Sequence, residues 1–197
     1  MRRLFTLLVI VVCARLYSQH DSLIADTIPL YHGHRHVGVG FNYTSPAPGL
    51  SVKLPLWKNE LIQISYSQKS YSWDYYGMVG WGYSWVFYSA EYQHRFEEKL
   101  LGNKVHYIPF VYAGGGFGQT KWNGDYFWYF GGNWEKTQDW FGYNLGGGVE
   151  LFPPIFKNNL GITAKLGFGS YATANMYGYS SNGGHLLFGG SAHYYFL

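Results

Sequence analysis

The chain has 197 residues, of which 21% are aromatic and only 13% are charged, whereas about 25% charged residues is usual for a soluble globular domain. Its 14 Lys and Arg against 11 Asp and Glu give a formal net charge of +3. Three basic residues, Arg2, Arg3 and Arg15, precede residue 18 without any acid beside them, so the rest of the chain is charge-balanced. This balance argues against nucleic-acid binding, which needs a basic patch.

The N-terminus has the pattern of a secretory signal peptide. A short basic region precedes an apolar run at residues 4–12 that is too short to span a bilayer, and small or polar residues follow. We predict a signal peptide over residues 1–18, cleaved after Ser18, and a periplasmic lead-in over residues 19–36. The only cysteine, Cys13, falls within the predicted leader, so the exported chain would contain no disulfide.

Three histidines, His32, His34 and His36, alternate at the end of the lead-in. On an extended chain their imidazoles would share one side and could hold a transition metal. No carboxylate or further ligand stands nearby, so we interpret them as a polar strand entry at the membrane surface. We therefore expect no metal site, cofactor or catalytic residue.

From residue 37 onward, apolar residues alternate with small or polar ones in about eight segments of roughly ten residues, the length and period of membrane-barrel strands. These segments lie at about residues 37–44, 50–56, 62–67, 86–96, 105–118, 141–151, 160–168 and 184–197. The fifth is ambiguous because aromatic and aliphatic residues occupy both faces, and there we place His106 and Gly114 inside.

The last segment, residues 184–197, gives the clearest indication of a membrane barrel. Tyr194 and Phe196 are expected to face lipid, and His193 and Tyr195 to face the lumen. A closed barrel pairs its last strand with its first, which removes the free sheet edge. We therefore predict an all-β fold, an eight-stranded antiparallel up-and-down transmembrane β-barrel over residues 37–197. A soluble β-sandwich would show the same alternation and is the alternative fold.

Two glycine-rich segments, PFVYAGGG at residues 109–116 and FGYNLGGGVE at residues 141–150, and the aromatic C-terminal segment resemble the small outer-membrane barrels of the OmpA/OmpX kind. The resemblance covers about residues 37–197. It implies the barrel fold and a location in the bacterial outer membrane, and it says little about function. Many such barrels end on the aromatic residue itself, whereas this chain ends in Leu197 after Phe196.

Five charged residues are expected to face the lumen. An eight-stranded barrel is just wide enough to be filled by side chains, and an unpaired buried charge costs several kcal/mol. We therefore expect ion pairs that plug the lumen, with Glu150 in reach of a basic partner, and no wide pore. A general acid in a cleft is the alternative role for Glu91 or Glu150. The five residues are Lys53, Glu91, Arg95, Glu150 and Lys165.

External loops are expected at residues 45–49, 70–82, 119–139 and 173–183, and the second and third are rich in aromatic residues. Rings interleaved with Gly, Asn and Asp are typical of surfaces that bind sugars or proteins. Alternatively, the rings form the outer aromatic girdle on strands that extend beyond the bilayer. The expected partners are outer-membrane lipid and lipopolysaccharide, and an envelope protein or a surface glycan through these loops.

The segment YSSNGGH at residues 179–185 partly resembles the His-x-Ser-Asn signature of the outer-membrane lipid A 3-O-deacylases. The resemblance implies Ser181 as nucleophile with Asn182 beside it, but Tyr179 occupies the position of the base that such a serine requires. His185 is the only nearby substitute. We therefore expect a structural or surface-interaction protein, with Ser181 in an external loop without a histidine partner. A lipid A-modifying hydrolase is the alternative function.

Overall fold

The computed structural model describes residues 37–44, 47–57, 59–75, 79–102, 104–126, 132–154, 159–175 and 178–196. Within these ranges no helix is both long and apolar enough to cross a membrane. The predicted signal peptide over residues 1–18, the predicted lead-in over residues 19–36 and the three histidines at its end lie outside the described residues. Only the barrel part of the predicted domain organisation can therefore be followed in space.

Nine β-strands follow one another in the described part of the chain. They are β1 (Gly38–Thr44), β2 (Ala47–Trp57), β3 (Glu60–Tyr75), β4 (Val79–Arg95), β5 (Lys99–Leu101), β6 (Val105–Tyr126), β7 (Gly132–Phe152), β8 (Leu160–Asn175) and β9 (Gly178–Tyr195).

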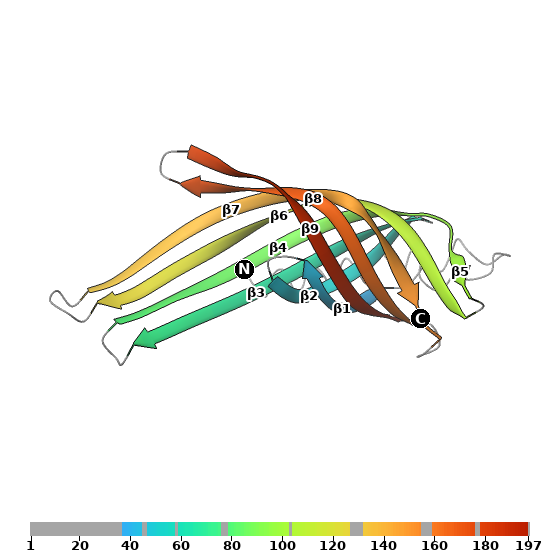
Figure 1. Cartoon of the computed structure of the whole chain (residues 1–197), viewed down its shortest axis with the longest axis horizontal. Helices are drawn as coiled ribbons and strands as arrows, with labels where there is room; N and C mark the ends of the chain where they lie inside the picture. Colours follow the sequence, from blue (N-terminus) through green and yellow to red (C-terminus); the bar gives the residue numbers. More distant parts are fainter. Residues whose placement is uncertain are drawn as a thin grey trace.

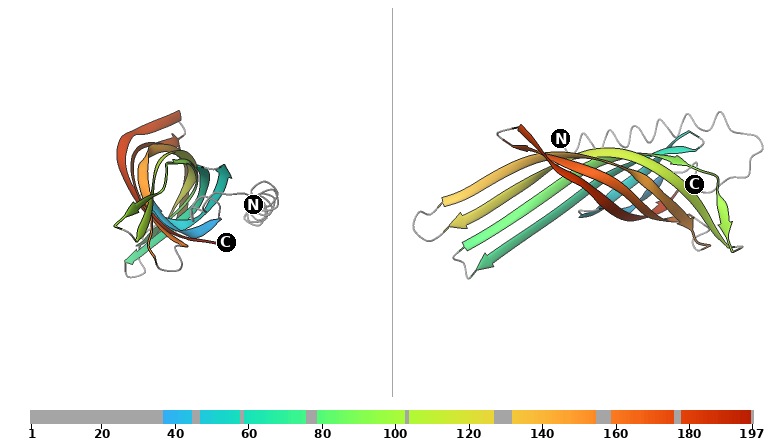
Figure 2. Two further views of the ribbon diagram at one scale, coloured as in Figure 1. Left: turned by 90° about the vertical axis from the view of Figure 1, so that its right-hand side faces the viewer. Right: turned by 45° about the horizontal axis from the view of Figure 1, so that its top comes forward.

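Eight of these strands close into an antiparallel barrel, as predicted (Figure 1). Each pairs with the next along the chain, except that β4 pairs with β6, and β9 returns to pair with β1. The short β5 pairs only with the start of β6. The end-on view in Figure 2 shows the strands curving round into a ring. Closure gives every barrel strand two neighbours, so the sheet has no open edge in the part of the barrel that all eight strands reach.

The outer face of the barrel is apolar and the inner face is polar, in the alternation expected from the sequence. On β9, Tyr194 is 41% exposed and faces outward, whereas His193 and Tyr195 are buried inside, so the prediction for the closing strand is confirmed. Other large outward side chains follow the same alternation: Val39, Phe41, Leu50, Val111, Leu145, Ile162, Leu166, Phe168, Leu186 and Phe188.

All four segments expected as external loops are mostly strand, including residues 47–49 of the first, which belong to β2. β6 has 22 residues and β7 has 21, about twice the 9–11 residues that a strand needs to cross a bilayer. Only residues 76–78, 127–131 and 176–177 separate the paired strands in the segments expected as loops at 70–82, 119–139 and 173–183. The expected loop boundaries were wrong because alternating aromatic, Ser and Thr residues favour a β-strand as well.

Two ends of the barrel can now be distinguished. We call the end at which β9 finishes the base and the opposite end the rim. Beyond the rim, β8 and β9 continue as a hairpin, and four other strands continue further, as a curved sheet that reaches well past β1 and β2 (Figure 1). We call this sheet the rim extension, and it consists of residues 68–75 of β3, 79–86 of β4, 119–126 of β6 and 132–139 of β7.

Candidate functional site

Glu150 is the centre of a buried charge cluster near the base. Its Oε1 accepts hydrogen bonds from Lys53 Nζ at 2.7 Å and from the Tyr195 hydroxyl at 2.6 Å. Its other oxygen, Oε2, accepts a hydrogen bond from Arg95 Nη2. The partners come from β2, β9 and β4, so the cluster ties together strands on different sides of the barrel. The prediction that Glu150 lies within ion-pair reach of an inward basic residue is confirmed.

A second buried ion pair joins β8 to β4. Lys165 Nζ donates a hydrogen bond to Glu91 Oε2 at 2.6 Å, and the same ammonium lies 5.1 Å from the centre of the Tyr112 ring. The other Glu91 oxygen accepts a hydrogen bond from Gln93 at 2.7 Å. Since both carboxylates have cationic partners, neither Glu91 nor Glu150 has the environment of a free general acid, and the pairs serve to satisfy buried charge.

Glycines make room for these long side chains. A Cβ atom at Gly161 would lie 2.5 Å from Glu150 Oε1, and one at Gly148 would lie 2.5 Å from the Phe110 ring. Real Cβ atoms do not tolerate such approaches. The glycine-rich faces of β7 and β8 therefore allow charged groups to meet across the lumen.

The ambiguous segment, now β6, turns its even-numbered residues inward. Ile108, Phe110 and Tyr112 are buried, whereas Val111 and Phe117 are exposed on the outer face. Ile108 packs with Phe152 and Tyr195 into a small apolar cluster at the base. His106 lies on the same side of the strand and contacts Glu98, and Gly114 lies beside the inward Asn144, its register partner on β7, so the inward placement of both is confirmed.

A small cavity lies above the charged residues, on the rim side. Its volume is about 30 Å³, and Glu91, Lys165 and Tyr171 contribute to its wall. A water molecule needs roughly 10–15 Å³ of such volume, so the cavity accommodates water but no larger solute. The side-chain oxygens of Asn42 and Asn144, which also line it, accept no hydrogen bond from the described residues.

An outward aromatic row runs across four strands at the rim. Tyr66 on β3, Tyr88 on β4, Phe117 on β6 and Phe141 on β7 are direct neighbours in the strand register. The rings of Tyr66 and Tyr88 are 5.2 Å apart, and those of Tyr88 and Phe117 are 5.3 Å apart. Aromatic girdles of this kind mark the membrane–water boundary of outer-membrane barrels. We call this row the rim girdle.

The two faces of the sheet exchange polarity immediately beyond the rim girdle. The next outward row reads Gln68, Val86, Gln119 and Asp139, so three of its four residues are polar, and Gln119 donates a hydrogen bond to Asp139 at 2.8 Å. Further outward positions are polar and mostly exposed: Ser70, Ser72, Ser84, Lys121, Asn123, Glu135 and Thr137. The outer face of the rim extension is therefore hydrophilic, whereas its inner face is aromatic.

The inner surface of the rim extension consists of three rows of inward-facing residues, and we call this surface the aromatic face. In register from β3 to β7, the first row reads Lys69, Trp85, Thr120, Gln138 and the second reads Tyr71, Tyr83, Trp122, Lys136. The third begins with Trp73, Trp81 and Gly124. The registers of β3, β4, β6 and β7 contain no bulge here, so these residues share the face that carries Glu91 and Gln93 lower in the barrel.

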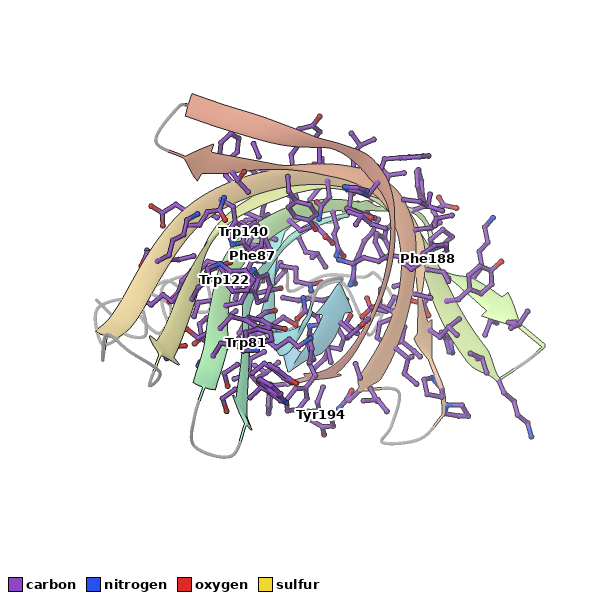
Figure 3. The ribbon with its side chains drawn as sticks, turned by 60° about the vertical axis from the view of Figure 1, so that its left-hand side comes forward. Trp81, Phe87, Trp122, Trp140, Phe188 and Tyr194 are labelled. Carbon is purple, nitrogen blue, oxygen red and sulfur yellow. The ribbon has the colours of Figure 1, made fainter. Side chains whose placement is uncertain are left out.

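The aromatic face begins on a buried ring stack. Trp140 stacks on Phe87 with 4.5 Å between ring centres and on Trp85 with 5.1 Å. Figure 3 shows Trp140, Phe87, Trp122 and Trp81 in one column on the inner side of the strands, away from the outward Phe188 and Tyr194. Glycines again permit the packing, since a Cβ at Gly118 would lie 2.7 Å from Trp140. The stack lies beside the cavity, whose wall includes Phe87.

Towards the tip the rings become exposed. Tyr71 is 47% exposed, Trp73 43% and Trp81 40%. Tyr71 contacts Trp81 and Tyr83, and Tyr83 contacts Trp122 at 5.4 Å between ring centres. The rings therefore form a continuous track from the buried stack to the tip. Over the six-residue rise from Phe87 to Trp81 this track is about 20 Å long.

The residues proposed for a hydrolase are not assembled into a site. Ser181 lies in β9, opposite Ala172 of β8, and not in an external loop as expected. Its side chain is outside the described residues. His185 lies four positions along the same strand, which places the two backbones about 13 Å apart, too far for a serine–histidine hydrogen bond. The hydrolase alternative therefore receives no support from the structure.

The fold and its surfaces define the class of protein. A closed eight-stranded antiparallel barrel with an apolar outer band, an aromatic girdle and a polar, charge-paired interior is a small β-barrel of the bacterial outer membrane. Among the described residues, His, Cys, Asp and Glu side chains do not gather in threes at any point where they could hold a metal ion.

Comparison with known proteins finds likenesses among solved structures. No family model matches the chain, and no curated protein matches it. Among solved structures, the N-terminal β-barrel domain of Pseudomonas aeruginosa OprF is similar with 15% identity and a TM-score of 0.47, covering 82% of this chain and 96% of that one.

Two further structures are similar over the same share of the chain. Yersinia pestis Ail, in complex with the heparin analogue sucrose octasulfate, has 13% identity and a TM-score of 0.48, with 82% of this chain and 97% of Ail covered. Acinetobacter baumannii CarO has 9% identity and a TM-score of 0.39, with 82% and 98% covered. With TM-scores below 0.5, none of these likenesses says what this chain binds.

Proposed function

We propose that this outer-membrane barrel is a surface-interaction protein that binds glycans on the aromatic face, above a lumen plugged by ion pairs and stacked rings. The observation that carries the proposal is the exchange of polarity at the rim girdle. Below it, apolar side chains point outward to lipid, and above it, aromatic side chains point inward, where no lipid can cover them. Large exposed aromatic surfaces on a protein mark interaction sites.

The chemistry of the aromatic face suits sugar rings. Tryptophan and tyrosine offer flat apolar faces for the C–H side of a pyranose, and tyrosine hydroxyls and neighbouring polar groups can bond its hydroxyls. Tyr71, Trp81 and Trp122 supply these rings, and Thr120 and Gln138 stand beside them in the rows. All are held on paired strands, which position a site more accurately than loops do.

The same arrangement speaks against transport through the barrel. The charge cluster around Glu150, the Glu91–Lys165 pair and the Trp140 stack lie in series along the lumen. The cavity between the last two has a volume of only about 30 Å³. The plugged lumen thus serves as a rigid support for the rim extension. In this proposal the rim faces the outside of the cell, because the strands continue far beyond the barrel at that end, where barrels of this kind have their longer external segments.

Tryptophan fluorescence tests the proposal directly. The protein, reconstituted in lipid nanodiscs, is titrated with a panel of soluble neutral and anionic polysaccharides. Trp81→Ala and Trp122→Ala should each weaken binding about three- to tenfold, the free energy typical of one aromatic contact. Trp57→Ala is the matched control, since Trp57 is 70% exposed at the base end of β2, away from the aromatic face.

Two outcomes would contradict the proposal. One is the absence of saturable binding to any polysaccharide of the panel. The other is binding that Trp57→Ala weakens as much as Trp81→Ala does, since this would place the contact outside the aromatic face. Circular dichroism of each variant establishes that the barrel is folded before the affinities are compared.

A further inference from the structure

Charge is divided unequally between the two faces of the rim extension. On the inner side, the described residues include Lys69 and Lys136 and no acidic side chain. On the outer side, Lys121 lies 3.6 Å from Glu135, and Asp139 accepts a hydrogen bond from Gln119. The aromatic face is therefore positively charged, whereas the outer face contains both signs.

The two lysines stand on opposite sides of the ring track. Lys69 of β3 is directly opposite Trp85, and Lys136 of β7 is directly opposite Trp122. They occupy the two outermost strands of the four and adjacent inward rows. With strands about 4.8 Å apart and inward rows about 6.8 Å apart, their Cα atoms are about 16 Å apart along the sheet.

Both ammonium groups are available to a ligand. Lys69 and Lys136 are exposed, and neither forms an ion pair with another described residue, in contrast to Lys53, Lys121 and Lys165. Two like charges beside one apolar surface, with no counter-ion among the described residues, add no stability to the fold. It provides an attractive field for a ligand that carries several negative charges.

We propose that the ligand of the aromatic face is an anionic polysaccharide, whose sugar rings stack on the tryptophans while its acidic substituents bind Lys69 and Lys136. This inference rests on the proposed glycan-binding function and narrows it to one charge class. A polymer fits better than a single small anion, because the two ammonium groups are too far apart for one carboxylate or sulfate to reach both. Repeated acidic groups on one chain would engage both lysines at once.

Three polymers with the same sugar backbone distinguish the contribution of charge to binding from that of the sugar rings. Dextran is neutral, whereas dextran sulfate and carboxymethyl dextran are anionic. The nanodisc-embedded protein should bind both anionic polymers more tightly than dextran, with an affinity that falls as salt concentration rises. Lys69→Gln and Lys136→Gln should each weaken binding of the anionic polymers about fivefold, the effect of losing one exposed charge contact. Neither substitution should change binding of dextran. Lys121→Gln, on the outer face, is the matched control.

The outcomes separate this inference from the proposed function. Equal affinity for dextran and dextran sulfate, with both lost in Trp122→Ala, would overturn the charge preference and leave glycan binding intact. Binding of dextran sulfate that Lys121→Gln weakens as much as Lys69→Gln would also overturn it, because attraction would then come from any surface lysine. A difference between the sulfated and carboxymethylated polymers identifies which acidic group the lysines prefer, and either preference supports the inference.

Discussion

Lys53 and Glu150 meet across the centre of the barrel, with Nζ 2.7 Å from Oε1 and both side chains almost completely buried. They are 97 residues apart in the chain, and their strands, β2 and β7, lie opposite each other in the ring of eight. The pair therefore ties together two halves of the barrel that have no backbone hydrogen bond in common. Arg95 and Tyr195 attach two further strands to the same carboxylate.

The first prediction concerns this carboxylate. Glu150→Ala leaves Lys53 and Arg95 buried without their counter-ion, and breaking a buried pair in this way typically costs about 3–5 kcal/mol. We expect a loss of that size in the free energy of unfolding, measured by urea titration in detergent micelles with tryptophan fluorescence. Glu135→Ala is the control, because the Lys121–Glu135 pair is more than half exposed and such pairs contribute about 0–1 kcal/mol. Equal losses would mean that the cluster does not stabilise the barrel.

The second prediction concerns the plugged lumen. Protein reconstituted in planar lipid bilayers should show no steady conductance, because the proposed plug of ion pairs and stacked rings leaves a cavity of only about 30 Å³ beside it. A general porin inserted under the same conditions provides the positive control. Stable porin-sized currents from the purified barrel would show that the ion pairs do not block the lumen.

The third prediction tests where the membrane ends. Leu145 and Thr137 lie on the same outward face of β7, about 27 Å apart along the strand, on opposite sides of the rim-girdle residue Phe141. Leu145→Arg should cost about 2–4 kcal/mol, because it places a charge near mid-bilayer, whereas Thr137→Arg should cost almost nothing. Unfolding free energies in lipid vesicles measure both. Equal tolerance would show that the polarity exchange does not mark the membrane boundary.

Much of the barrel could be predicted from residue alternation alone, because one face of each strand meets lipid and the other meets the lumen. The inward placement of Lys53, Glu91 and Glu150 and the outward placement of Tyr194 followed from that rule and are confirmed. Which cation meets which carboxylate could not be predicted. That choice depends on the stagger between distant strands, and Lys165 pairs with Glu91 while Glu150 binds Lys53 and Arg95.

Strands that continue beyond the bilayer were one of two expectations for the aromatic segments, but the inward direction of their rings was not predicted, for a different physical reason. The strands of the rim extension alternate as regularly as those in the membrane: Ser70, Ser72 and Ser84 point outward, and Tyr71, Trp73 and Trp81 point inward. Above the membrane, water replaces lipid outside, so the aromatic residues move to the inner side and the phase of the pattern reverses. The rule that apolar residues face outward therefore fails there, although the period of two was present in the sequence as a strand signal.

The fourth prediction links the buried ring stack to the exposed rings. A Cβ atom at Gly118 would lie 2.7 Å from two atoms of Trp140 and 2.6 Å from the backbone oxygen of Val86. Gly118→Ala should therefore displace Trp140 from its stack on Phe87 and Trp85, at a cost of about 1–3 kcal/mol from overpacking. The near-ultraviolet circular dichroism of the tryptophans should fall with it. Because the exposed rings continue from this stack, polysaccharide binding should weaken as well.

Gly80→Ala is the matched control for that substitution. Gly80 is also in a strand of the rim extension, but the nearest atom to an added Cβ is the backbone oxygen of Trp73 at 3.8 Å, an ordinary contact distance. We expect a change in stability within about 0.5 kcal/mol, as for surface substitutions in general, with an unaltered tryptophan spectrum. If Gly118→Ala keeps the near-ultraviolet signal and the affinity of Gly80→Ala, the Trp140 stack does not support the aromatic face. The exposed rings must then be positioned by the strand pairing of β3, β4 and β6 alone.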